Sequence, residues 1–359
     1  MASVKPKLWK GNEAIAEAAI RAGCKAYFGY PITPQNEIPE YMSWRMPESG
    51  GVFLQAESEI AAINMVYGAS AAGVRAMTSS SSPGISLKQE GISYLAGAQL
   101  PAVIVNMMRG GPGLGSIQPA QSDYSQATRS AGHGDARMIV LAPGSIQEAV
   151  DLMQDAFDLA DRYRMPVTVL ADGMIGQMME PIVFKDRAPT ALPAKDWAAV
   201  GREAPGKTHF VTSLRLDAAD NEQFNRELQD RYKQIEQQEL RYEALQCQDA
   251  QIIIAAYGTT ARVALSAVRE LNQQGIRAGL FRPITLWPWP YEQLRALVQQ
   301  PSVKAVLTAE MSAGQMLEDV KLAVLGAKPT PFYGRMGGMV PDALEIVSQV
   351  REIIGEDKA

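Results

Sequence analysis

Three segments in the first half of the chain combine polar or ionisable side chains with glycine and proline. They are residues 29–34 (GYPITP), residues 55–70, which include Glu57 and Glu59, and residues 106–115 (NMMRGGPGLG). Arg109 can bind a carboxylate or phosphate through two parallel hydrogen bonds, and the glycines after it let the backbone approach a ligand closely. No G-x-G-x-x-G opens a helix here and no G-x-x-x-x-G-K-[ST] occurs, so this is not a typical nucleotide loop. The segments predict a site for a small acid beneath a mobile glycine-rich lid.

The residue types in two of these segments can also be explained by helix formation alone, without a ligand. Thr33 before Pro34 is a good helix start, with Thr as the N-cap and Pro at the first helical position; alternatively, the Thr33 hydroxyl and nearby amides face a ligand anion at that helix N-terminus. Glu57 and Glu59 could serve only as acids that the helix dipole favours, or one of them could be catalytic. Being two residues apart, they do not share a helix face, so one can face solvent while the other enters the edge of the core.

Other reactive side chains give weaker signals. His133 lies between two glycines and could contact a ligand, although a solvated loop histidine is the commoner explanation. Cys24 and Cys247 are expected to be ordinary buried thiols. Residues 78–84 (TSSSSPG) predict a polar loop before a helix that starts near Pro83, and they lack the G-x-S-x-G elbow of a hydrolase.

Composition limits the class of protein. The 359 residues carry 34 Lys and Arg against 39 Asp and Glu, a net charge of −5, which disfavours nucleic-acid binding because phosphate neutralisation needs a cationic surface. Two cysteines are too few for a four-thiolate iron–sulfur cluster. The amino terminus lacks a signal-peptide pattern, and no apolar stretch approaches the roughly 18 residues of a membrane span. A soluble, cytoplasmic protein without a membrane span is expected, with any redox centre located elsewhere.

The elements that must position these side chains alternate as βα units. Short apolar runs bounded by glycine and proline predict strands buried on both faces of a parallel sheet; they cover residues 25–29, 52–55, 74–79, 102–106, 138–141 and 167–170. Helices are expected over residues 12–22 and after Ser145, where Ser145 and Glu148 have the spacing of a capping box. The first half is therefore predicted to be a doubly wound α/β domain, with its ligand site outside the carboxyl ends of the strands.

The second half begins with a change of composition. Residues 185–214 contain several prolines and predict an extended connector, and residues 217–245 are dense in charge with a narrow apolar stripe at helical spacing. A solvated linking helix is the simpler interpretation, and a partner-docking helix is the alternative. Strands at 251–258, 276–281 and 305–309, with helices at 259–274 and 311–325, predict a smaller α/β domain. The expected division is residues 1–190, 191–245 and 246–359.

Four of these strings, in this order and spacing, resemble the α subunit of 2-oxoacid:ferredoxin oxidoreductases: residues 29–34, Glu59-Ile-Ala-Ala, residues 78–84 and Met108-Arg-Gly-Gly-Pro-Gly113. The resemblance covers essentially the whole chain. It implies that the first domain is the pyrimidine-binding domain of a thiamine-diphosphate enzyme. The last domain is similar to the transketolase carboxy-terminal type.

The resemblance also implies roles for particular residues. Glu59 matches the acid that hydrogen-bonds the aminopyrimidine N1′ of thiamine diphosphate, because of its distance to Gly68 and the small residues between them; Glu57 fits worse. Thr33 and Arg109 are placed in the substrate pocket, with Arg109 gripping the 2-oxoacid carboxylate and Thr33 acting as a hydroxyl donor beside the keto group. The remaining implied contacts are Pro31, Ile32, Ser82 and Pro83 for the cofactor and Gly110 and Gly111 for the substrate.

An absent motif implies partner chains. The family holds the diphosphate and Mg2+ with a Gly-Asp-Gly motif, whereas this chain has only Ala171-Asp-Gly173 and Gly134-Asp-Ala136. A β subunit is therefore expected to supply Mg2+ and a [4Fe-4S] cluster, and this chain to supply no metal ligand. The expected set is completed by γ and δ (ferredoxin-like) subunits, ferredoxin, coenzyme A and a 2-oxoacid. The chain is expected to be active only with these partners, in oxidative decarboxylation to acyl-CoA and CO2.

Within the family, residues 110–124 look closer to the branched-chain (2-oxoisovalerate) α subunits than to the 2-oxoglutarate enzymes, which more often carry Pro-Ser-Thr-Gly there. Apolar and aromatic residues, Met107, Met108, Leu114 and Tyr124, are expected to suit an apolar or aryl substrate. The alternatives are a 2-oxoglutarate- or pyruvate-specific member, the pyrimidine-binding subunit of a transketolase-like or lipoamide-dependent enzyme, or a sensing or assembly module that kept the fold without the chemistry.

Overall fold

The computed structural model describes residues 5–185, 190–201 and 208–355, and they build three β-sheets. The sheet that concerns the candidate site has seven strands, which are parallel except for the edge strand β12. In spatial order they are β12 (Thr285–Trp287), β6 (Ile139–Leu141), β7 (Pro166–Asp172), β5 (Ala102–Met108), β4 (Ala76–Ser80), β2 (Ala26–Gly29) and β3 (Val52–Gln55). All six strands expected in the first half are present, with ends shifted by up to two residues.

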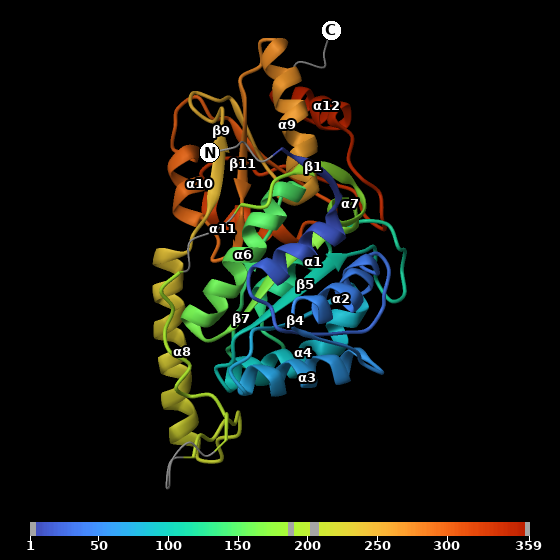
Figure 1. Cartoon of the computed structure of the whole chain (residues 1–359). Coiled ribbons are helices and arrows are strands. Elements are labelled where there is room, and N and C mark those ends of the chain that lie inside the picture. The colour runs from blue at the N-terminus through green and yellow to red at the C-terminus, as the bar shows by residue number, and fades with distance from the viewer. Residues whose placement is uncertain (1–4, 186–189, 202–207, 356–359) are drawn as a thin grey trace.

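Helices cover both faces of this sheet, as a doubly wound fold requires (Figure 1). One layer packs together α1 (Gly11–Arg21), α2 (Glu37–Glu48) and α6 (Ile146–Tyr163), and the other consists of α3 (Glu59–Ala71) and α4 (Ser82–Gly97). Strands β4, β5 and β7 are buried along their whole length, which explains why they are continuous apolar or small-residue runs without alternation. Two short helices, α5 (Tyr124–Arg129) and α7 (Gly173–Gln177), follow β5 and β7.

The second α/β block forms a five-stranded sheet. Its strands in spatial order are β14 (Phe332–Gly334), β13 (Ala305–Glu310), β10 (Ile252–Ala255), β11 (Ala278–Pro283) and β9 (Tyr242–Leu245). Its helices are α9 (Gly258–Gln273), α10 (Tyr291–Val298), α11 (Gln315–Val324) and α12 (Ala343–Ile354). The sequence did not predict β12, which leaves this block and pairs antiparallel with β6 of the first sheet. The division into domains near residues 190 and 246 stays a prediction.

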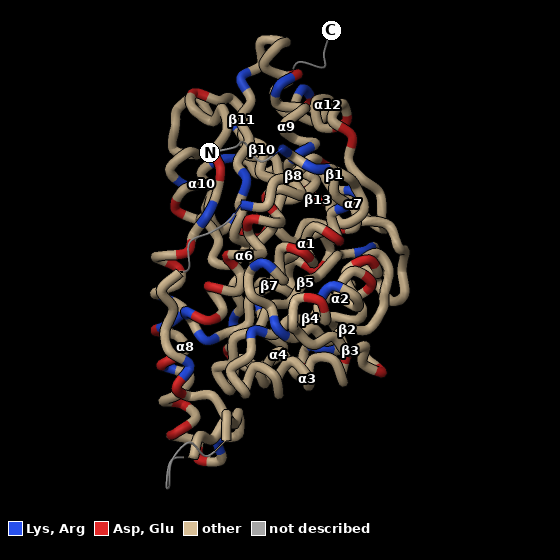
Figure 2. The backbone as a smooth tube through the Cα atoms, in the orientation of Figure 1, with Lys and Arg blue, Asp and Glu red and all other residues tan. Residues whose placement is uncertain are grey.

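The connector and the charged segment are largely as expected. The described part of residues 185–214 contains no helix or strand, and α8 (Ala218–Gln238) follows it. Figure 2 shows charges of both signs along α8, and its buried residues are the four apolar ones that form the stripe, Phe224, Leu228, Tyr232 and Ile235. The helix ends before residue 245, because residues 242–245 pair as β9 with β11 instead. A further small sheet joins β1 (Lys7–Lys10) to β8 (Met179–Ile182).

Two local predictions are corrected. No helix starts at Thr33, since α2 begins only at Glu37. The capping box at Ser145 is half formed: Ser145 accepts from the backbone N–H of Glu148, but the Glu148 carboxylate accepts from Gly144 N–H and pairs with Arg282 at 2.6 Å. The pairing with Arg282, 134 residues away, is a tertiary contact that a local motif does not reveal. Among the described helices, none has the length and apolar character that crossing a bilayer requires.

Candidate functional site

The candidate residues gather at the carboxyl ends of β2, β3, β4 and β5, four neighbouring strands of the first sheet. Thr33 follows β2, Glu59 follows β3, Ser82 follows β4, and Arg109 follows β5 directly. Because the strands are parallel, their following loops meet at one sheet edge. The three chemically distinctive segments, separated by as many as about 80 residues in the sequence, therefore lie at one edge of the sheet.

Glu59 is the first residue of α3 and its side chain is buried, with 6% of the residue exposed. Ser58 caps the helix and accepts from the backbone N–H of Ala61, which sets the direction in which the first turn leaves the strand. Glu57, two residues earlier, is exposed. The structure thus separates the two acids as expected: Glu57 faces solvent and Glu59 enters the edge of the core.

Gly84, in the first turn of α4, leaves the space in which the Glu59 carboxylate lies. A Cβ at residue 84 would come within 2.6 Å of Glu59 Oε1 and 2.1 Å of Ser80 Oγ. No side chain larger than hydrogen is therefore accommodated there without displacing one of these oxygens. The Ser80 and Ser81 hydroxyls are both buried and lack a hydrogen-bond partner among the described residues. Buried polar atoms without partners are uncommon in proteins, and Ser80 Oγ shares the space around Gly84 with the Glu59 carboxylate.

The serine loop after β4 connects Glu59 to Arg109. Ser82 adopts a positive φ of 21°, and its backbone N–H donates to Asn106 Oδ1 at 3.2 Å. Its hydroxyl accepts from the backbone N–H of Arg109 at 3.0 Å and donates to Asp123 Oδ2 at 2.6 Å. Asn106 Nδ2 also donates to that carboxylate oxygen at 2.9 Å. Asp123 thus fixes the loop against β5 and Arg109.

Burial raises the pKa of Asp123, which is partly offset by its hydrogen bonds from Ser82 and Asn106. No local pattern predicts this role, because Asp123 lies 41 residues from Ser82 along the chain. Pro83 lies within the first turn of α4, which starts at Ser82 as expected.

The Arg109 side chain bridges two of the loops. Its NH1 donates to the backbone carbonyl of Thr33 at 3.0 Å and its NH2 to the carbonyl of Leu114 at 3.2 Å. Its Nε is buried and has no partner among the described residues. Only 9% of Arg109 is exposed, so the guanidinium is desolvated and held by neutral carbonyls. A desolvated cation of this kind binds a small anion strongly.

Thr33 lies in a turn rather than at a helix N-terminus. The turn is closed by Gln35 N–H donating to the carbonyl of Ile32. The Pro34 carbonyl accepts from the side chains of Asn12 at 2.7 Å and Gln177 at 2.8 Å. These bonds come from α1 and α7, so tertiary contacts rather than helix propensity set the conformation of residues 31–36. Pro31 is exposed and Ile32 is half-buried at the same edge.

The glycine-rich lid is anchored at its base. Gly110 N–H donates to Gln118 O at 2.9 Å and Gly110 O accepts from Ser116 N–H at 2.7 Å. A Cβ on Gly110 would approach the backbone carbon of Gly337 to 2.8 Å, so glycine is required here by packing against the second α/β block. Gly111 and Leu114 are exposed, Leu114 by 85%. The lid therefore projects from a fixed base.

A cavity of about 380 Å3 lies beside Thr33. Its lining includes the apolar residues Ile117 and Met174 and one charged residue, Glu37. Burial alone would raise the pKa of Glu37, but hydrogen bonds from Lys10, Asn12 and Gln177 leave it below its ordinary value. The cavity therefore presents apolar surface and an ionised carboxylate whose charge is balanced by Lys10.

The four residues expected to form an apolar substrate pocket do not line this cavity. Met107, Met108 and Tyr124 are fully buried in the core, where β5 is covered on both faces, and Leu114 points to solvent on the lid. The side chains found instead, Ile117 and Met174, follow β5 and β7. Their positions depend on how the loops fold back, which no local pattern specifies.

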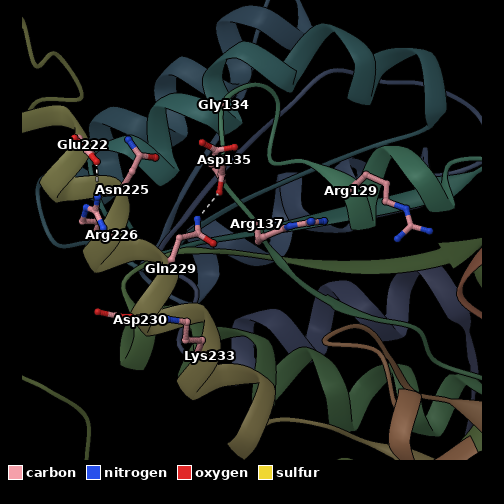
Figure 3. Close-up of a pocket in the computed structure, with 11 residues that line it drawn as sticks. Arg129, Gly134, Asp135, Arg137, Glu222, Asn225, Arg226, Gln229, Asp230 and Lys233 are labelled. Atoms are coloured by element: carbon pink, nitrogen blue, oxygen red, sulfur yellow. Dashed lines mark hydrogen bonds and ion pairs between the residues drawn. The ribbon is translucent and has the colours of Figure 1, made fainter. Parts of the chain in front are cut away.

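The remaining reactive residues lie outside the site. His133 is exposed and its ring packs edge-on against Tyr94, in agreement with a solvated loop histidine. Burial raises the pKa of the Cys24 and Cys247 thiols to about 12, so both are inert. Figure 3 shows a separate open hollow of about 570 Å3 between residues 134–137 and α8; its ion pairs Arg226–Glu222 and Lys233–Asp230 are internal to α8, and no candidate residue lines it.

Two family models match the chain. The model described as pyruvate flavodoxin/ferredoxin oxidoreductase, thiamine diphosphate binding, matches residues 17–245, and pyruvate:ferredoxin oxidoreductase core domain II matches residues 250–346. Among solved structures, the 2-oxoglutarate:ferredoxin oxidoreductase from Magnetococcus marinus, with 2-oxoglutarate, coenzyme A and succinyl-CoA bound, superposes with a TM-score of 0.86 at 27% identity, covering 99% of this chain and 66% of that chain. A split-gene transketolase, an inactive β4 tetramer, shares the fold alone, with a TM-score of 0.58 at 14% identity over 96% of this chain and 98% of that one.

Curated relatives match over nearly the whole length. Ketoisovalerate oxidoreductase subunit VorB of Methanothermobacter marburgensis is 52% identical over 347 residues, covering 97% of each chain. 2-Oxoglutarate synthase subunit KorA of Methanothermobacter thermautotrophicus is 35% identical over 367 residues, covering 95% of this chain and 97% of the relative. Together with the two family models and the site at the sheet edge, these matches show that the chain belongs to the 2-oxoacid:ferredoxin oxidoreductase family, within the thiamine-diphosphate enzymes.

Proposed function

We propose that this chain is the α-type catalytic subunit of an oxidoreductase that converts a branched-chain or aryl 2-oxoacid, with coenzyme A, to acyl-CoA and CO2. The observation that carries the proposal is the buried Glu59 carboxylate at the sheet edge that also holds Arg109 against Thr33. A buried acid and a desolvated guanidinium are costly to retain unless each meets a ligand.

The residues around Glu59 fit thiamine diphosphate. The unpartnered Ser80 and Ser81 hydroxyls and the space left by Gly84 provide polar atoms and a close backbone approach beside the carboxylate. Glu59 would hold the pyrimidine N1′, and Pro31, Ile32, Ser82 and Pro83 would flank the ring. When bound, the cofactor supplies the nucleophilic carbon and the electron sink for decarboxylation.

Arg109 and Thr33 would bind the substrate in this proposal. Arg109 donates to the substrate carboxylate from its unpartnered Nε. Its NH1 and NH2 groups exchange their present hydrogen bonds to backbone carbonyls for bonds to the same carboxylate. The Thr33 hydroxyl, which accepts from Asn36 Nδ2 at 3.2 Å, donates to the keto oxygen. The Gly110 and Gly111 backbone closes over the acid and excludes water.

The cavity beside Thr33 supports the preference for an apolar side chain. Its apolar lining residues Ile117 and Met174 suit an isopropyl or aryl group, and the lining that the structure describes includes no lysine or arginine to bind the second carboxylate of 2-oxoglutarate. The name of the relative that is 52% identical refers to ketoisovalerate, whereas that of the relative at 35% identity refers to 2-oxoglutarate. Both observations favour the branched-chain acid.

A β-type partner would complete the cofactor site. The layer of α3 and α4 beside Glu59 is poor in charge (Figure 2) and exposes Ile60 by 50%, Leu87 by 51% and Tyr94 by 37%. An exposed apolar surface of this kind is typical of protein interfaces. In the proposal that partner supplies Mg2+ and a [4Fe-4S] cluster, further γ- and δ-type subunits pass electrons to ferredoxin, and the complex works in the cytoplasm.

The assembled complex tests the substrate assignment. Reduction of a viologen dye is measured with coenzyme A and a panel of 2-oxoisovalerate, phenylpyruvate, pyruvate and 2-oxoglutarate. The proposal predicts the highest kcat/KM for 2-oxoisovalerate or phenylpyruvate. A higher value for 2-oxoglutarate would reject the substrate assignment, and no dye reduction with any 2-oxoacid would reject the activity.

A further inference from the structure

Lys88, in the middle of α4, is fully buried and is among the largest side chains with no exposed surface. Lysine is almost never fully buried unless it is paired, because removing an ammonium from water costs much free energy. In the described part of the chain, no carboxylate lies within the 4.0 Å limit of an ion pair with it. None of the roles assigned to the site residues explains why a lysine occupies this position.

The Lys88 ammonium joins two parts of the candidate site. It donates to the backbone carbonyl of Glu59 at 3.3 Å and to Thr78 Oγ1 at 3.1 Å. Glu59 opens α3, and Thr78 belongs to β4. The lysine therefore ties the residue that bears the proposed catalytic carboxylate to the central strand beside it.

Lys88 and Gly84 act from the same face of α4, since they are four residues apart. Gly84 leaves the space for the Glu59 carboxylate, and Lys88 holds the Glu59 backbone. One face of α4 thus contacts both the backbone and the carboxylate of Glu59. A methionine would fill the same volume without the cost of a buried charge.

The electrostatic setting also points to Glu59. A cation at the N-terminus of α3 is unfavourable because of the helix dipole, so the charge needs compensation. Helix α4 packs against α3, β5 and β7. The ionisable groups on these elements are Glu59, Tyr67 and Asp172. Burial raises the pKa of Tyr67, which keeps it neutral, and Asp172 is bound to Thr259 and to the first amides of α7. Burial lowers the pKa of Lys88 to about 8, and the charge of Glu59 opposes this effect.

We propose that Lys88 is a positioning residue that holds Glu59 in place, and supplies its counter-charge, for contact with the cofactor's pyrimidine ring. The inference rests on the proposed function, because it presumes the role of Glu59. In its protonated form Lys88 keeps both hydrogen bonds and balances the buried carboxylate. When it loses its proton, this compensating charge is lost.

The test uses Lys88→Met in the complete complex and measures the Kd of thiamine diphosphate by calorimetry, from pH 6.5 to 9, together with kcat. We expect at least a tenfold higher Kd and a tenfold lower kcat at pH 7. The wild-type affinity should weaken through a step near pH 8 that the variant lacks. If the Lys88→Met complex does not assemble, the same measurements are made on Lys88→Gln, which keeps a hydrogen-bond donor without the charge.

Lys195→Met is the matched control. Lys195 also bridges two elements, with its ammonium 2.7 Å from Asp161 and bonded to Gly73 O, but it lies on the connector. The control should leave the Kd and its pH dependence unchanged. If all lysine variants weaken binding equally, or if both Lys88 variants retain the wild-type Kd and the step near pH 8, the positioning role is wrong.

Glu59→Gln separates this inference from the proposed function. An inactive Glu59→Gln complex beside Lys88 variants that behave as wild type would remove only the role of Lys88. A fully active Glu59→Gln complex would remove the proposed role of Glu59 itself, whatever the lysine variants show.

Discussion

Arg109 donates from NH1 to the backbone carbonyl of Thr33 at 3.0 Å, which joins the loops after two strands into one wall of the site. The contact uses the main chain of Thr33 and leaves its hydroxyl available. The two residues can therefore be tested separately: a change of the Thr33 side chain keeps the bond, whereas a change of Arg109 removes it.

The first prediction concerns this pair. Arg109→Met should raise the KM for the 2-oxoacid by about 10- to 100-fold, because a bidentate, charge-assisted contact to the carboxylate is lost. Thr33→Val, which preserves the carbonyl, should mainly lower kcat. Steady-state kinetics of the complex measure both, and an unchanged KM in Arg109→Met would contradict the carboxylate grip.

A second prediction concerns Asp123, whose Oδ2 accepts from Ser82 at 2.6 Å and from Asn106 at 2.9 Å. Asp123→Asn removes the charged acceptor with little change of shape. It should lower the free energy of unfolding by about 1–2 kcal/mol and reduce kcat/KM, because Ser82 no longer fixes the backbone of Arg109. Scanning calorimetry and kinetics check this; Ser86→Ala, at an exposed position of α4, should change neither quantity.

The third prediction is a pH dependence of stability that arises from Lys88. Its pKa is about 8 in the folded chain against 10.5 ordinarily, so between these values the unfolded chain binds more protons than the folded one. Stability relative to Lys88→Met should therefore rise with pH across this window, by at most about 1.4 kcal/mol per pH unit. The Tm of the wild-type complex minus that of the Lys88→Met complex, measured from pH 7 to 10, should become more positive above pH 8; a constant value would contradict the perturbed lysine.

A fourth prediction tests the cavity beside Thr33. Ile117→Arg places a cation in its apolar lining, so it should lower kcat/KM for 2-oxoisovalerate by about tenfold and raise that for 2-oxoglutarate. Leu114→Arg adds the same charge on the exposed lid, outside the cavity lining, and should leave the ratio of the two values near that of the wild type. Equal changes in both variants would show that general charge, rather than this cavity, governs selectivity.

Much of the fold could be predicted because the parallel strands are local apolar runs. Residues 52–55 were predicted exactly as β3, and Glu57 and Glu59 separated as their spacing required. The three segments meet at one edge of the sheet because each follows a strand, and these strands are parallel. These features depend on short-range patterns and on one topological rule.

The rest depends on contacts between distant residues. Thr33 does not start a helix because Asn12 and Gln177 bind the Pro34 carbonyl from other helices. Strand β12 crosses to the first sheet, and Asp123 reaches Ser82, through pairings that no periodicity encodes. The burial of Lys88 is likewise invisible in the sequence, where a lysine on a helix is expected to face water.

The most direct test of the central claim is the rate of 2-oxoacid oxidation by the complete complex with Glu59→Gln, compared with Glu57→Gln. Glutamine keeps the size of Glu59 but cannot act as the carboxylate partner of the cofactor. We expect a loss of at least 100-fold in kcat for Glu59→Gln with an assembled, folded complex, and near wild-type turnover for Glu57→Gln, whose side chain is exposed. Undiminished oxidation by Glu59→Gln would contradict it.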